Sequence, residues 1–132
     1  MKKEDSRKFE DKIIEAGYKH NMDKYIVNLQ NSQLHINYSD THKSFLKLYG
    51  HKMPVLSFDV SSDDALLATG SIDKDIRIWD MDFGQSIKSI FAHQEPVTIV
   101  RFIPETHYLL SGGKDGHLKY WDMDTYQLIM DF

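Results

Sequence analysis

Short apolar runs, rather than a helical periodicity, organise most of this chain. Residues 55–60 and 97–103 are dense in β-branched and aromatic side chains, and residues 76–79 and 118–121 alternate apolar side chains with a basic one. Alternation with a period of two is typical of a strand with one buried face, and a short continuous apolar run suits a strand buried on both faces. The pattern predicts an all-β fold class.

Turn signals separate these runs. Lys114-Asp115-Gly116 lies between two of them, and glycine tolerates the positive φ that a tight turn requires. We therefore expect strands near residues 25–29, 33–38, 44–48, 55–60, 66–69, 76–79, 87–91, 97–103, 108–111, 118–121 and 128–132.

The second half of the chain contains an internal repeat. Residues 50–90 align without a gap with residues 92–132 at an offset of 42, and twelve of the 41 positions are identical. Both tryptophans of the chain, Trp79 and Trp121, are among the matches. Chance would give about two or three identities at ordinary composition. A period near 42 residues is typical of a four-stranded propeller blade.

The repeated residues resemble the WD-repeat family. Its pattern is a Gly-His dipeptide, a hydroxyl residue, a turn aspartate and a closing Trp-Asp. The two copies read Gly50-His51, Thr69, Asp73, Trp79-Asp80 and Ala92-His93, Ser111, Asp115, Trp121-Asp122. Ala92 departs mildly from the pattern. The resemblance implies one WD repeat over residues 49–91 and a second over residues 92–132.

The first part of the chain carries a weaker signal. Residues 25–48 are interpreted as the second half of a degenerate blade, with Tyr38 in the tryptophan position and Asn31 near the turn aspartate. Residues 1–24 fit no strand pattern and are expected to be a charged lead-in, as a loop or disordered segment; a short helix over 9–18 has poor spacing. The prediction is a WD-repeat β-propeller fragment of about two and a half four-stranded blades.

Histidine, a hydroxyl and an aspartate also make a hydrolytic triad, so each copy has two interpretations. The indole N–H only donates, a carboxylate only accepts, and a hydroxyl and a neutral imidazole do both. A one-way chain from tryptophan through hydroxyl and histidine to aspartate therefore pairs every group. Ser71 aligns with Gly113, whereas Thr69 aligns with Ser111, which favours Thr69 as the hydroxyl. We expect structural hydrogen-bond chains, repeated in adjacent blades, of His51, Thr69, Asp73, Trp79 and of His93, Ser111, Asp115, Trp121.

Composition and residue spacing argue against several other classes of function. The formal net charge is −4, which argues against strong nucleic-acid binding by this segment as a whole, and the absence of cysteine excludes thiolate metal sites. We expect no metal site, because five further histidines lack the spacing of metal ligands: His20, His35, His42, His107 and His117. We also expect no catalytic residues and no cofactor. Several basic residues are candidates for phosphate contact, although solvation explains them more simply: Lys2, Lys3, Arg7, Lys8, Lys43, Lys47 and Lys52.

Two stretches are more specific than the generic repeat. Residues 48–56, and 82–84 with 88–93, are similar to the large nucleolar WD-repeat subunit of the small-subunit processome, the U-three-protein-twelve or WD-repeat-containing protein three family. The resemblance covers about residues 25–132. It implies a non-enzymatic scaffold for small-subunit ribosomal RNA processing in the nucleus and nucleolus. The implied partners are other processome proteins, with at most indirect or weak contact with small nucleolar RNA and pre-ribosomal RNA, and neither a membrane nor a small-molecule substrate.

Two rival functions remain open at this stage. A generic WD-repeat scaffold in signalling or ubiquitin ligation shares the repeat but does not require the two specific stretches. Adaptors of cullin-type ligases carry an arginine two residues after the Trp-Asp aspartate, where this chain has Asp82 and Asp124. A propeller hydrolase would need an accessible nucleophile and base near His51 or His93.

Overall fold

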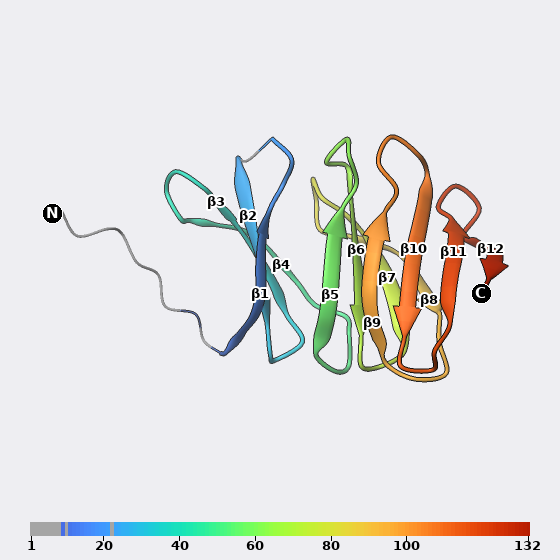
Figure 1. The fold of residues 1–132 in the computed structure, drawn as a ribbon. Coiled ribbons are helices and arrows are strands. Elements are labelled where there is room, and N and C mark those ends of the chain that lie inside the picture. Colours follow the sequence, from blue (N-terminus) through green and yellow to red (C-terminus); the bar gives the residue numbers. More distant parts are fainter. Residues whose placement is uncertain (1–8, 10, 22) are drawn as a thin grey trace, which may run out of the picture.

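A computed structural model describes residues 9, 11–21 and 23–132. The described chain forms twelve strands and no helix (Figure 1). No helix long and apolar enough to cross a membrane occurs in this part of the chain. The strands are β1 Ile13–Tyr18, β2 Lys24–Leu29, β3 Leu34–Tyr38, β4 Ser44–Leu48, β5 Val55–Val60, β6 Leu66–Ser71, β7 Asp75–Asp80, β8 Ser86–Phe91, β9 Val97–Phe102, β10 Tyr108–Gly113, β11 Leu118–Asp122 and β12 Gln127–Asp131.

The strands form three four-stranded antiparallel meanders that stand in a row (Figure 1). We call β1–β4 blade 1, β5–β8 blade 2 and β9–β12 blade 3. Register repeats between blades: Leu67 lies opposite Trp79 in blade 2, and Leu109 lies opposite Trp121 in blade 3. The predicted all-β propeller fragment is confirmed, with three blades in place of two and a half.

The extra half blade comes from a segment expected to be loop. Residues 13–18 form β1, which pairs with β2 from Tyr18↔Tyr25 to Ile13↔Leu29. A register shift between Ile13 and Glu15, together with the small residues Ala16 and Gly17, removes the alternation by which a strand is recognised. The alternative of a short helix over 9–18 is wrong for residues 13–18. Of the segment 1–24, residues 1–8, 10 and 22 lie outside the described residues.

Small residues in β1 have a packing role. A Cβ on Gly17 would lie 3.3 Å from the Phe58 ring, so β1 and β5 approach closely there. Such tertiary packing, which local sequence does not reveal, stabilises a strand of low intrinsic propensity.

Apolar side chains fill the two spaces between blades. One buried cluster joins blades 1 and 2: Ile26, Leu34, Ile36, Leu48, Val55, Phe58, Val60, Leu67, Trp79 and Met81. The other joins blades 2 and 3: Ala68, Ile76, Ile78, Ile90, Ala92, Val97, Val100, Phe102, Leu109, Trp121 and Met123. Each blade therefore buries the face that it turns toward a neighbouring blade, as layered β structures do.

Blade 1 departs from the repeat in its polar positions. Asn37 lies opposite Tyr25, in the register that Trp79 has opposite Leu67, and Asn37 is fully buried. Tyr38, which we assigned to the tryptophan position, lies one residue further on and is 38% exposed. The assignment of Tyr38 is therefore wrong by one residue, because Tyr38 precedes His51 by 13 residues whereas Trp79 precedes His93 by 14. Asn31 does act in the turn, because its Oδ1 accepts the Gln33 amide at 3.1 Å.

Candidate functional site

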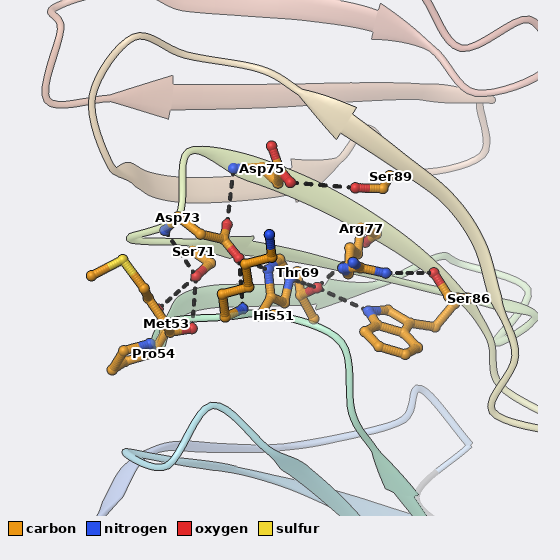
Figure 2. Close-up of polar contacts among 12 residues, drawn as sticks. His51, Met53, Pro54, Thr69, Ser71, Asp73, Asp75, Arg77, Ser86 and Ser89 are labelled. Atoms are coloured by element: carbon orange, nitrogen blue, oxygen red, sulfur yellow. Dashed lines mark hydrogen bonds and ion pairs between the residues drawn. The ribbon is translucent and has the colours of Figure 1, made fainter.

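The four predicted residues of blade 2 meet in one hydrogen-bonded chain (Figure 2). Trp79 Nε1 donates to Thr69 Oγ1 at 2.9 Å, and Thr69 Oγ1 lies 2.6 Å from His51 Nε2. His51 Nδ1 lies 2.9 Å from Asp73 Oδ2. Because the indole can only donate and the carboxylate can only accept, the network assigns the proton to His51 Nδ1 and lets Thr69 donate to Nε2.

Blade 3 repeats the same chain. Trp121 Nε1 donates to Ser111 Oγ at 2.9 Å, Ser111 Oγ lies 2.9 Å from His93 Nε2, and His93 Nδ1 lies 3.1 Å from both carboxylate oxygens of Asp115. The structure therefore brings together all eight residues singled out from the sequence, as two sets of four.

Local geometry explains how the aspartate reaches the histidine. Asp73 lies in the turn between β6 and β7, where the next residue, Lys74, adopts a φ of 75°, and Asp73 Oδ1 accepts the Asp75 amide at 3.0 Å. Asp73 Oδ2 also accepts the Lys52 amide at 3.1 Å, which fixes the loop that enters blade 2. Short polar side chains that accept their own backbone two residues on are typical of such turns.

Ser71, which the alignment disfavours as the hydroxyl of the tryptophan chain, makes a different set of hydrogen bonds. Its Oγ donates to the Met53 and Pro54 carbonyls, each at 2.9 Å, and accepts the Asp73 amide at 3.2 Å (Figure 2). Ser71 therefore ties the end of β6 to the entering loop and stands outside the tryptophan chain.

The pKa shifts keep the aspartate of each chain ionised and disfavour protonation of His93. Burial raises the pKa of Asp115, but the His117 and Gln94 amides and the His93 side chain outweigh it and lower that pKa to about 2. The pKa of Asp73 is lowered in the same way: burial opposes the shift, and the His51 side chain with the Asp75 and Lys52 amides produces it. Burial lowers the pKa of His93, and Asp115 offsets only part of that effect.

These shifts predict loss of stability in acid. Below pH 6.5, the ordinary histidine value, the unfolded chain binds a proton at His93 more readily than the folded chain, so stability falls. Stability falls a second time between pH 4 and 2, because the Asp115 carboxylate binds a proton more readily in the unfolded chain than in the folded chain. The urea midpoint of the intact protein, measured from pH 8 to 5.5, should decrease, and His93→Gln should flatten that slope.

The burial of the hydroxyl and histidine side chains limits the chemistry that the two hydrogen-bonded chains can perform. Thr69 and Ser111 are both 0% exposed, and His93 is also 0% exposed. A nucleophile must touch its substrate, and a buried hydroxyl that already bonds histidine and tryptophan has no such contact. The arrangement can hold β6 to β7 in blade 2 and β10 to β11 in blade 3, and it can tie each pair to the loop that enters its blade.

Sequence reasoning missed the polar contacts between blades. Ser57 Oγ accepts the Val100 amide at 3.2 Å, and Asp59 Oδ2 accepts the Phe102 amide at 2.7 Å. Both side chains lie on β5 and satisfy backbone groups at the edge of β9. Their aligned positions in blade 3 are Ile99 and Arg101, so the repeat gave no signal for this role.

One further group of residues offers ligand atoms. His107, Asp122 and Asp124 place one nitrogen and two carboxylate oxygens within 4.8 Å of one another. His107 and Asp124 are exposed, and Asp122 Oδ1 already accepts the Asp124 amide at 2.8 Å. That turn bond accounts for the position of Asp122 without an ion.

Known proteins match both the sequence and the fold. A family model described as "WDR3 second beta-propeller domain" matches residues 1–132. "Structure of U3-55K" superposes with a TM-score of 0.91 at 20% identity, and "Crystal structure of RRP9 WD40 repeats" with 0.90 at 21% identity. Each alignment covers 96% of this chain and 40% of the solved chain. At these identities the two structures show that the chain has the propeller fold. This chain spans less than half the length of either solved chain.

Proposed function

Because the chain belongs to the family of WDR3 second β-propeller domains, we propose that it is a non-enzymatic scaffold for ribonucleoprotein assembly in small-subunit ribosomal RNA processing. The family match over residues 1–132 carries this proposal. It agrees with the resemblance of residues 48–56 and 82–93 to the nucleolar processome subunit. The proposed location is the nucleus and nucleolus, and the proposed partners are other processome proteins.

The geometry supports a scaffold in two ways. The His–hydroxyl–Asp–Trp chains are buried and identical in layout in adjacent blades, so we assign them a structural role and no catalytic one. Rigid sheets present exposed turns on both rims, and loops held by such scaffolds commonly carry recognition. No cofactor is required for this role.

The experiment is to follow the intact gene product in cells. A tagged form should concentrate in the nucleolus and should co-purify with small-subunit pre-ribosomal particles. Its depletion should lower mature small-subunit ribosomal RNA and leave the large-subunit species nearly unchanged, because the proposed role lies on one maturation branch. Quantitative hybridisation of both mature species in the same extracts measures this.

Two results would contradict the proposal while leaving the fold intact. Equal loss of both ribosomal RNA species would indicate a general growth effect. A purely cytoplasmic protein without pre-ribosomal RNA in its pull-down would favour the rival scaffold in signalling or ubiquitin ligation. Re-expression of the protein in depleted cells is the control, since it should restore the small-subunit species.

A further inference from the structure

An exposed tyrosine stands where the chain passes from blade 1 to blade 2. Tyr49 follows β4 and is 60% exposed, although an aromatic side chain of this size gains free energy when it is buried. It is absent from both apolar clusters between the blades. Neither apolar cluster therefore accounts for the aromatic ring at this position.

Three cationic residues lie near Tyr49, two of them close in sequence and one on β7 beside the next residue, Gly50. Lys47 precedes Tyr49 by two residues, Lys52 follows it by three, and both are exposed. Arg77 comes from β7, and its Nη1 lies 3.0 Å from the point where a Cβ on Gly50, the next residue, would stand. Figure 2 shows Arg77 with its bond to Ser86 Oγ, at 3.1 Å. Lys47, Tyr49, Lys52 and Arg77 are called the junction patch.

The basic side chains of the patch have no acidic partner among the described residues. Within the described part of the chain, Lys47, Lys52 and Arg77 form no ion pair, whereas Lys19 and Lys24 both pair with Asp23. Arg77 Nε is buried and has no hydrogen-bond acceptor. The nearby carboxylate of Asp73 is occupied by His51 and by the Lys52 and Asp75 amides. A local positive charge therefore persists on a chain whose formal net charge is −4.

We infer that the junction patch binds single-stranded RNA, with a base stacked on Tyr49 and phosphates beside the basic side chains. Aromatic faces that stack bases, combined with cations that follow the backbone, are how proteins hold single strands. An acidic peptide would use the cations but would gain little from the exposed ring. The inference rests on the proposed role in ribonucleoprotein assembly, which brings single-stranded RNA to this surface.

The test uses the intact gene product and a fluorescein-labelled oligouridylate of about a dozen nucleotides, followed by fluorescence anisotropy. Tyr49→Ala should weaken binding roughly fivefold to 150-fold, the measured range for loss of one stacked base. A Lys47→Ala/Lys52→Ala double variant should weaken binding and lower the slope of log affinity against log salt by about 1 to 1.5. Ultraviolet crosslinking followed by mass spectrometry should place the crosslink on Tyr49.

Phe83→Ala is the matched control. Phe83 is 76% exposed on the turn between β7 and β8, and its neighbour Asp82 is acidic. Its removal should leave affinity unchanged, and circular dichroism should show that every variant is folded. Unchanged affinity in both patch variants, an equal loss in Phe83→Ala, or a loss in the lysine variant without one in Tyr49→Ala would each overturn the inference.

Particle association separates this inference from the proposed function. If the wild-type protein co-purifies with pre-ribosomal particles but Tyr49→Ala binds oligouridylate normally, RNA binding by the junction patch is refuted and the proposed scaffold function is retained. If Tyr49→Ala loses RNA binding while the wild-type protein never enters such particles, RNA binding by the junction patch is supported and the proposed function in small-subunit particles is refuted.

Discussion

Truncation of Asp73 to alanine is expected to lower the free energy of unfolding of the intact protein by about 1–3 kcal/mol for each buried donor that loses its acceptor. The carboxylate accepts His51 Nδ1 and the Lys52 and Asp75 amides, so several groups are affected at once. Urea denaturation measures the change. Asp82→Ala is the control, since Asp82 is exposed and its substitution should change stability by less than about 0.5 kcal/mol.

Replacing Trp79 by phenylalanine tests the other end of the chain. The phenyl ring is still apolar, but Thr69 Oγ1 loses the hydrogen bond that Trp79 Nε1 donates to it at 2.9 Å in the wild-type protein. The expected cost is again about 1–3 kcal/mol. If either variant kept wild-type stability and instead abolished a measurable turnover, the structural role of these residues would be refuted.

The sequence predicted blades 2 and 3 well because their key residues act within one repeat. His51, Thr69 and Trp79 belong to adjacent elements of one blade, and the second copy resolved the choice between Thr69 and Ser71. The donor and acceptor chemistry of four residue types then left one arrangement that pairs every group.

Blade 1 was predicted less well because its positions have lost that chemistry. Val27 aligns with Thr69 and Asn37 with Trp79, so no polar chain marked the register. Its first strand was missed since Ala16 and Gly17 have low β propensity, and pairing with β2 together with packing on Phe58 stabilises it. These contacts are tertiary, which is why no local pattern contained them.

Expressed by itself, the 132-residue chain is expected to oligomerise or to unfold easily. Leu110, Leu118 and Tyr120 of blade 3 align with Ala68, Ile76 and Ile78, which are three of the blade 2 residues that pack on blade 3. Ile76 is fully buried, whereas Leu118 is 39% exposed because no blade covers it here. Exposed apolar faces and unpaired strand edges favour association, and closed propellers have roughly four to eight blades.

Light scattering after gel filtration, with a thermal melt, measures this outcome. A monomer that melts cooperatively above roughly 60 °C, near the top of the mesophilic range, would contradict it. A Leu118→Lys variant should lower self-association of the isolated chain, because it places a charge on the uncovered face of blade 3. Lys114→Ala is the control, since Lys114 lies in the exposed turn between β10 and β11 and its loss should leave association unchanged. Equal self-association in wild type and Leu118→Lys would show that another surface is responsible.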